Sequence, residues 1–137
     1  YNNSYNSYAY IESAEKIMAR VLIVDDSPTE THKMTTILSK HGYEVVTAES
    51  GEEGVAKAKE TLPDVVLMDI VMPGLNGFQA TRQLSKHDST SHIPVIIVTT
   101  KDQETDRLWG KRQGAKGYLT KPVEDQTLMK AIADVLA

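Results

Sequence analysis

Short apolar segments and amphipathic segments alternate along the chain from Arg20 onward, and this alternation constrains the fold more than any other feature. We predict strands over residues 21–24, 44–48, 65–68, 95–98 and 117–119. Three of these segments are continuous apolar runs, which is typical of strands that are buried on both faces of a sheet. Strands that alternate with helices in this way predict an α/β protein with one parallel, doubly wound sheet.

The segments between the strands carry the signals of helices. Ser27, Pro28 and Glu30 have the pattern of a capping box with Pro at the first helical position, and Gly42 suits the residue that follows a helix end. We therefore predict a first helix between Ser27 and Gly42. Four further helices are predicted over residues 52–60, 78–86, 103–113 and 124–136.

The first 17 residues differ in composition from the rest of the chain. The segment YNNSYNSYAYIESAEKI is rich in Tyr, Asn and Ser, and Met18 reads as a natural start just before the first strand. We interpret residues 1–17 as an added or upstream extension. A native tail that docks on a partner is the alternative. Residues 18–137 suit one compact domain, and we expect no output domain after the last helix.

Charge and composition exclude several classes of function. The formal net charge is −4, and no Lys- and Arg-rich segment stands out, so we expect no binding to nucleic acid. Cysteine is absent, which excludes disulfides and thiolate metal sites. No apolar run approaches the roughly 20 residues of a membrane helix. The sequence therefore predicts a soluble, cytoplasmic protein without membrane insertion.

Polar residues occur where four of the predicted strands end. In open parallel sheets, ligands bind outside the carboxyl ends of the strands, so these residues are candidates for a functional site. They are Asp25, Asp26, Asp69, Thr99, Thr100 and Lys121.

The residue types at this edge favour phosphoryl transfer. Neighbouring carboxylates repel one another, and Mg²⁺, which binds carboxylate oxygens, would relieve that repulsion. A carboxylate such as Asp69 can attack phosphorus, while Lys121 and Thr99 could stabilise the charge on the phosphoryl oxygens. Each residue alone could be an ordinary turn, cap or loop residue. Their joint occurrence at one end of four strands is what indicates a site.

Four sequence segments carry a family resemblance. They are VLIVDDS, VVLMDIVMPGLNG, PVIIVTT and GYLTKPV, in this order along the chain. From Met18 to Ala137 the chain resembles the receiver domains of two-component response regulators, and among them the stand-alone twitching-motility regulators of type IV pilus systems. The resemblance implies the CheY-like, flavodoxin-like receiver fold with five strands and five helices.

The resemblance also implies a phosphoacceptor and a metal site. Asp69 would accept the phosphoryl group. Asp25 and Asp26 would hold Mg²⁺, one of them through water, and Asp69 and the backbone carbonyl of Val71 would complete the protein ligands. The side chain of Val71 has no polar group that could orient an attacking water.

Three further residues would form the switch. By resemblance, Thr99 and Lys121 would each bind a phosphoryl oxygen, and the bond between Lys121 and Pro122 is usually cis in the family. Tyr118 matches the aromatic residue that changes rotamer with phosphorylation. If Thr99 moves toward the phosphoryl group, Tyr118 can fill the vacated space and change the face formed by residues 103–113, 117–119 and 124–136.

The implied partners are proteins. The resemblance predicts a histidine kinase, CheA-like, as phosphodonor, and a downstream protein target on that face. The chain would then be a phosphoacceptor in twitching-motility or chemotaxis-like signalling, and not an enzyme beyond slow autophosphatase activity. A phosphate sink for a shared kinase is the alternative to an output role.

Three other classes of function remain as alternatives. A phosphatase of the haloacid-dehalogenase class needs an acid two residues after its nucleophile, but Ser27 and Val71 occupy those positions after Asp25 and Asp69. A nucleotide-binding domain would need a Gly-rich phosphate loop, and the first strand is followed by DDSPTE. A receiver-shaped module that is never phosphorylated would have no need for the complete set of polar residues.

Trp109 and the histidines have no assigned role in this chemistry. The simpler interpretation of Trp109 is that it packs against neighbouring elements, and the alternative is that it anchors a partner. The histidines have no metal-site spacing, and we predict that all of them lie on the surface. They are His32, His41, His87 and His92.

Overall fold

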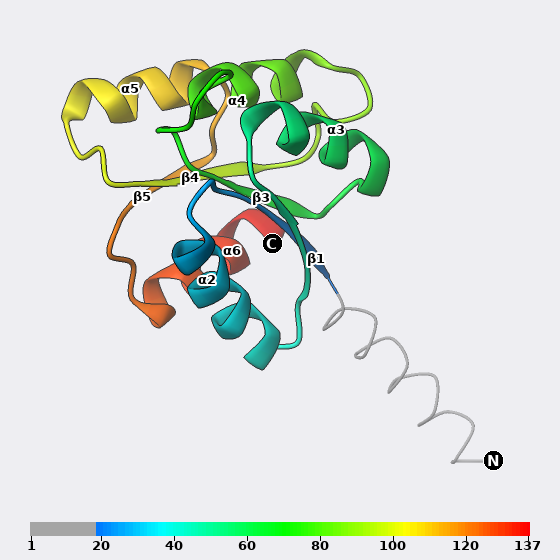
Figure 1. Cartoon of the computed structure of the whole chain (residues 1–137), viewed down its shortest axis with the longest axis vertical. Coiled ribbons are helices and arrows are strands. Elements are labelled where there is room, and N and C mark those ends of the chain that lie inside the picture. Colours follow the sequence, from blue (N-terminus) through cyan, green and yellow to red (C-terminus); the bar gives the residue numbers. More distant parts are fainter. Residues whose placement is uncertain (1–18) are drawn as a thin grey trace.

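The computed structural model describes residues 19–137, and the predicted extension at residues 1–17 lies outside this part. Five parallel strands form one sheet in the order β2-β1-β3-β4-β5 (Figure 1). The order confirms the predicted doubly wound sheet of the flavodoxin-like type. The strands are β1 (Arg20–Val24), β2 (Glu44–Ala48), β3 (Val65–Met68), β4 (Val95–Thr99) and β5 (Gly117–Thr120).

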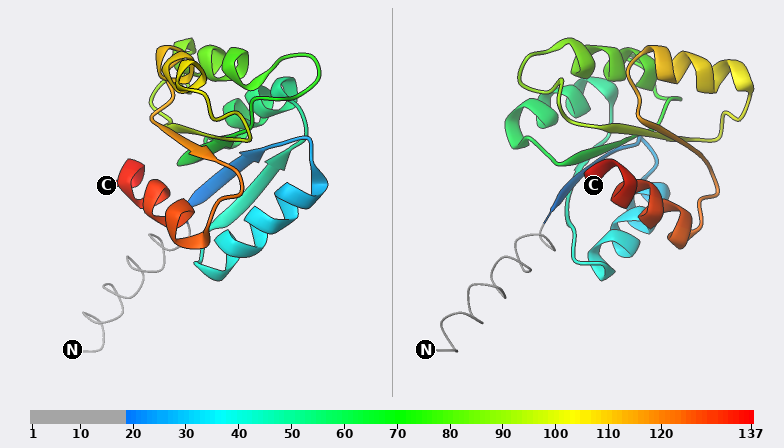
Figure 2. Two further views of the ribbon diagram at one scale, coloured as in Figure 1. Left: turned by 90° about the vertical axis from the view of Figure 1, so that its left-hand side faces the viewer. Right: turned by 180° about the vertical axis from the view of Figure 1, so that it is seen from behind.

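The helices form a layer on each face of the sheet. Helices α2 and α6 cover one face, and α3, α4 and α5 cover the other (Figures 1 and 2). The helices are α2 (Pro28–Lys40), α3 (Gly51–Thr61), α4 (Gly77–Lys86), α5 (Glu104–Arg112) and α6 (Asp125–Leu136). Within residues 19–137, none of these helices combines the length and the apolar character that a membrane span requires.

Alternate residues of β1 supply the two halves of the core. Leu22 and Val24 pack among the side chains of α3 and α4, whereas Val21 and Ile23 pack among those of α2 and α6. All four are fully buried. Because both faces of the strand lie under helices, every position must be apolar, which explains why the segment reads as a continuous apolar run.

The register of the strands brings their carboxyl ends to one edge of the sheet. Val24 pairs with Met68, and Met68 pairs with Ile97. The next backbone bond continues this pairing, since the N–H of Asp69 donates to the carbonyl of Val24 over 2.9 Å. The polar residues that follow these strands are therefore neighbours in space.

The N-terminus of α2 differs from the predicted capping box. Ser27 Oγ accepts a hydrogen bond from the N–H of Glu30 at 3.3 Å, as predicted. The N–H of Ser27, however, donates to Asp25 Oδ1 at 2.9 Å. An acid of the functional edge thus takes the bond that Glu30 would have accepted, and the reciprocal half of the prediction is wrong.

The prediction that Trp109 packs against its neighbours is also wrong. Trp109 and Leu108 remain 49% and 51% exposed. The only buried residue of α5 is Gly110, where an added Cβ would come within 2.7 Å of Ile97 Cδ1. The helix approaches the sheet closely through Gly110, and this packing leaves the two large side chains exposed. The four histidines are exposed, as predicted.

Candidate phosphoacceptor site

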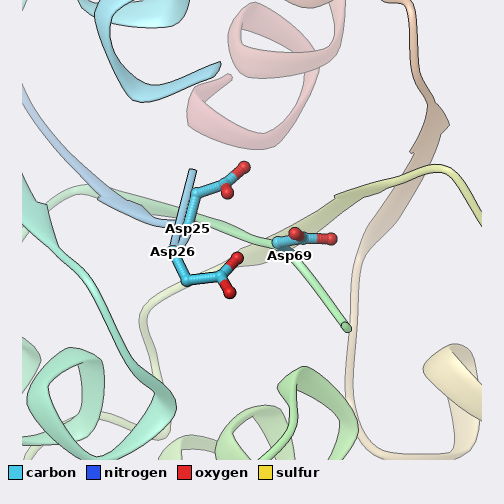
Figure 3. Close-up of side chains that lie close together, drawn as sticks. All are labelled: Asp25, Asp26 and Asp69. Carbon is cyan, nitrogen blue, oxygen red and sulfur yellow. The ribbon is translucent and has the colours of Figure 1, made fainter. Parts of the chain in front are cut away.

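Three carboxylates converge at the carboxyl edge of the sheet. Asp25 and Asp26 follow β1, and Asp69 follows the neighbouring strand β3 (Figure 3). One carboxylate oxygen from each lies within 4.8 Å of the others. Asp25 and Asp69 are buried, with 2% and 8% exposure, whereas Asp26 is exposed. The structure thus brings together the three acids that the sequence predicted.

Lys121 enters the same cluster from the end of β5. Its Nζ lies 2.7 Å from Asp25 Oδ2 and 3.6 Å from Asp69 Oδ2. Its backbone N–H donates to the carbonyl of Thr99 over 2.7 Å, which fixes the start of this loop against β4. The bond between Lys121 and Pro122 is cis, as the family resemblance implies.

Burial controls the protonation of Asp69. Desolvation raises the pKa of the Asp69 carboxyl above its ordinary value, and the charge of Asp25 raises it further. The opposing effects of Lys121, of the Ile70 N–H and of the Thr99 side chain are smaller in sum. The site therefore holds an acid whose negative charge is poorly compensated by the protein.

Lys121 keeps its proton in this environment. Burial by itself would lower the pKa of the ammonium group, but the hydrogen bond to Asp25 and the charges of Asp69 and Asp25 outweigh burial and raise it. The side chain is therefore a permanent cation between two buried acids. Such a group can attract a further anion, provided that it is released from part of its present pairing.

Thr99 and Tyr118 are both hydrogen-bonded to the backbone of Lys101. Thr99 is fully buried at the end of β4, close enough to Asp69 that its side chain lowers the pKa of that carboxyl against the effect of burial. Thr99 Oγ1 also accepts from the N–H of Lys101 at 3.4 Å. The hydroxyl of Tyr118 donates to the carbonyl of Lys101 at 2.8 Å. The loop at Lys101 therefore connects the two predicted switch residues.

Arg107 covers the ring of Tyr118, a contact that the sequence did not predict. Its guanidinium carbon lies 4.9 Å from the ring centroid, and Nη2 donates to Thr120 Oγ1 at 2.9 Å. Burial and the charge of Asp106 raise the pKa of Tyr118 to about 12, so that its hydroxyl remains a donor at neutral pH. Arg107 thereby connects α5 to two residues of the short strand β5.

Two further residues hold the loop after Asp69, and sequence reasoning missed both. Glu52 Oε1 accepts from the N–H of Leu75 at 2.6 Å. Gly77 packs directly against the carbonyl of Asp69, where a Cβ would collide with backbone atoms. The glycine could have been suspected because it opens a helix just after a candidate phosphoacceptor, whereas the contact of Glu52 spans two elements and has no local signal.

The donor set fits a divalent cation that prefers oxygen ligands. Both oxygens of Asp25 are engaged, by the N–H of Ser27 and by Lys121. Asp26, in contrast, makes no side-chain hydrogen bond or ion pair with any residue of 19–137 and offers its carboxylate to solvent. Val71 lies two residues after Asp69 with an exposed side chain. Three acids against one Lys leave negative charge that such a cation would balance.

Comparison with known proteins defines the class to which this fold and site belong. Residues 21–133 match the model of the response regulator receiver domain, which is most of the chain. The chain belongs to the response regulator receiver domain family. Receiver domains bind Mg²⁺ at an acidic pocket, take a phosphoryl group from histidine kinases and act on downstream targets.

Particular relatives make the relationship more specific. The chain is 71% identical over 120 residues to the protein PilH of Pseudomonas aeruginosa, which covers 88% of this chain and 99% of PilH. It is 36% identical to the chemotaxis protein CheY4 of Vibrio cholerae, with a TM-score of 0.82 over 87% of this chain and 99% of CheY4.

A third relative was solved in a complex with a partner. A complex of CheX and CheY with BeF₃ and Mg²⁺ from Borrelia burgdorferi contains a chain that is 29% identical to this one. The TM-score is 0.82, and the match covers 87% of this chain and 90% of that one. These relatives confirm the resemblance that the four sequence segments indicated.

The poorly compensated charge of Asp69 leads to a prediction about stability. In metal-free buffer at pH 7, Asp69→Asn is expected to raise the melting temperature by a few degrees, because it removes a buried charge beside Asp25. The direction of the change follows from the pKa of Asp69. A carboxyl whose pKa is raised in the folded state stabilises the fold only at low pH, and this stability is lost as the pH rises through the folded-state pKa. At pH 7 the charged Asp69 therefore destabilises the fold, and Asn avoids this cost.

Thermal unfolding followed by circular dichroism in EDTA measures this effect. Asp134→Asn is the matched control, since Asp134 is exposed in a surface pair with Lys130 and should change the melting temperature little. A lower melting temperature for Asp69→Asn than for the unchanged protein would show that its charge is compensated after all.

Proposed function

We propose that this chain is a phosphorylation switch in which Asp69 accepts a phosphoryl group from the phosphohistidine of a histidine kinase. The observation that carries the proposal is the convergence of three acids and a buried Lys121 at one edge of the sheet. A carboxylate oxygen of Asp69 would attack phosphorus as the bond from phosphorus to the kinase imidazole breaks. The released imidazole then takes up a proton.

Each neighbouring side chain has a role in this transfer. Lys121 would leave part of its pairing with Asp25 and bind one phosphoryl oxygen, and Thr99 would donate its hydroxyl to another. Asp25, Asp26, Asp69 and the carbonyl of Val71 would hold Mg²⁺. When bound, Mg²⁺ supplies positive charge against the phosphoryl oxygens. Slow loss of the phosphoryl group by hydrolysis would return the chain to its starting state.

The wider setting of the switch follows from the relationship to receiver proteins. We place the exchange in the cytoplasm, with a CheA-like kinase as donor and a protein target on the face formed by α5, β5 and α6. Signalling in type IV pilus twitching motility or a chemotaxis-like pathway is supported by the sequence resemblance. Residues 18–137 would form the receiver domain, and residues 1–17 an extension. The direction of the output would be decided by that target.

The exposed Asp26 gives the sharpest test of the metal site. At 100 times its dissociation constant, Mg²⁺ stabilises the folded state by about 2.7 kcal/mol, which corresponds to a rise in melting temperature of several degrees. Asp26→Asn is expected to abolish most of this rise, because it removes the carboxylate that has no other partner in residues 19–137.

Melting curves with increasing MgCl₂, compared with matched ionic strength from KCl, measure the effect. Glu49→Gln, an exposed acid that follows β2, serves as the control and should retain the full rise. An undiminished Mg²⁺ effect in Asp26→Asn would contradict the assigned metal site.

The contacts of Arg107 predict how the switch is biased. Because Arg107 lies over Tyr118 and is bonded to Thr120, Arg107→Ala is expected to release the ring and favour its alternative rotamer. If that rotamer accompanies phosphorylation, the variant should bind beryllofluoride with Mg²⁺ severalfold more tightly.

Beryllofluoride titration followed by amide chemical shifts of residues 99–120 measures this affinity. Lys111→Ala, on the same helix, is the control and should bind beryllofluoride as the unchanged protein does. Arg107→Lys keeps a positive charge over the ring, so its affinity should lie between those of Arg107→Ala and the unchanged protein. Equal affinities for Arg107→Ala and the unchanged protein would remove Arg107 from the switch.

A further inference from the structure

A groove of about 580 Å³ lies between α3 and α4, and its lining contains no residue of the acid cluster or of α5, β5 and α6. Its lining contains three permanent cations and a histidine but no acid, although acids outnumber Lys and Arg by 19 to 15 in the chain. The lining residues are Lys59, Leu75, Gln79, Arg82, Gln83, Lys86 and His87.

The cations of this groove are uncompensated by the protein. Among residues 19–137, Lys59, Arg82 and Lys86 take part in no ion pair and no side-chain hydrogen bond. Other lysines do find partners, as the half-buried Lys57 does with Glu53 at 3.5 Å and the exposed Lys130 with Asp134 at 3.2 Å. Glu52, the acid beside the Leu75 end of the groove, is already bonded to the backbone. The three cations of the groove are therefore available to an external anionic group.

The groove side of α4 presents hydrogen-bond donors at regular spacing. Gln79, Arg82, Gln83 and Lys86 stand at positions i, i+3, i+4 and i+7, which lie on one side of a helix. Gln79 uses its carbonyl oxygen to accept from the N–H of Asn76 at 2.9 Å, so that its amide hydrogens are free to donate outward. A row of amides and cations of this kind suits carboxylates.

The groove is separate from the neighbouring helix α5. Ser85 Oγ donates to the carbonyl of Gln113 at 3.0 Å, and Thr81 is fully buried, so these positions of α4 face α5 and the core. The cations of the groove lie on the other side of the helix. Leu75 gives the groove an apolar end, because its side chain packs only partly against the core.

We propose that this groove docks an acidic segment of a protein partner, with Asp or Glu side chains on the cations and one apolar side chain against Leu75. Charge complementarity selects this occupant, since three cations and a histidine face the groove without an opposing acid. Nucleic acid is a poorer match because the whole molecule carries a net charge of −4.

The test uses a short synthetic peptide rich in Glu with one central Leu, titrated into the isotope-labelled chain. Amide shift changes are expected on the residues that line the groove, and binding should weaken as salt is raised. The triple variant Lys59→Glu, Arg82→Glu and Lys86→Glu should lose at least about tenfold in affinity. A peptide with Gln in place of Glu should not bind.

A matched variant and two further probes make each outcome decisive. Reversal of three cations on or next to α5, Lys111→Glu, Arg112→Glu and Lys116→Glu, should leave the affinity within about twofold. Both triple variants should retain Mg²⁺-dependent phosphorylation of Asp69, which keeps this test independent of the proposed function. The proposal would be overturned if the two triple variants lost affinity equally or if the shift changes were centred on α5. It would also be overturned if inorganic polyphosphate or anionic vesicles bound in preference to the peptide.

Discussion

Asp69→Ala is expected to lose all Mg²⁺-dependent labelling by acetyl phosphate or by a phosphohistidine kinase, while the unchanged chain takes up one phosphoryl group. The reason is that Asp69 Oδ1 accepts from the N–H of Ile70, whereas its Oδ2 has only a 3.6 Å ion pair with Lys121 and can attack phosphorus. Asp25 has its oxygens occupied, and Asp26 lies toward solvent. Neither is therefore expected to substitute as nucleophile.

Intact-mass spectrometry after brief incubation measures the added phosphoryl group. Asp134→Ala, which changes an exposed acid on α6, should label like the unchanged protein. Retained labelling in Asp69→Ala would assign the nucleophile elsewhere. Continuous release of phosphate without an adduct would favour the phosphatase alternative, because a switch stores the group that a phosphatase turns over.

Lys121→Met is expected to have two large effects that arise from one contact. The ammonium group lies 2.7 Å from buried Asp25 and is itself largely buried. Its loss leaves acids without a partner, which should cost on the order of 3 kcal/mol in metal-free buffer and lower the melting temperature by on the order of 10 °C. Loss of a cation that would stabilise the phosphoryl oxygens should slow phosphorylation about 100- to 1,000-fold.

The two effects can be separated by experiment. Mg²⁺ should restore much of the stability of Lys121→Met, because it neutralises the same acids, but it should not restore the rate of labelling. Lys130→Met breaks the exposed pair with Asp134 and is expected to change stability by less than about 0.5 kcal/mol and the rate not at all. A variant that labels at the unchanged rate would show that Lys121 has only a structural role.

Much of the fold and of the candidate site could be predicted because both depend on local patterns. Buried parallel strands must be apolar at every position, as Val21 to Val24 are, and the residue after each strand must lie at the edge where ligands bind. The positions of Asp25, Asp69 and Lys121 follow from strand ends alone. The roles of these residues remain proposals that the labelling experiments address.

The features that escaped prediction depend on contacts between distant segments. No pattern in α5 shows that it packs through Gly110 and leaves Trp109 exposed, because that choice depends on the side chain of Ile97. The lost bond between Glu30 and Ser27 is the exception, because Asp25, which accepts from the N–H of Ser27 instead, is only two residues away. The Arg107 contact with Tyr118 likewise needs the three-dimensional proximity of a helix and a strand.

The exposure of Trp109 has a practical consequence. It is the only Trp in the chain, so the whole indole emission of the protein comes from one position on α5. Changes in that emission therefore report on the helix next to Tyr118, without an attached dye. Trp109 fluorescence therefore provides a way to follow, in real time, the binding of a kinase, of Mg²⁺ or of a target protein.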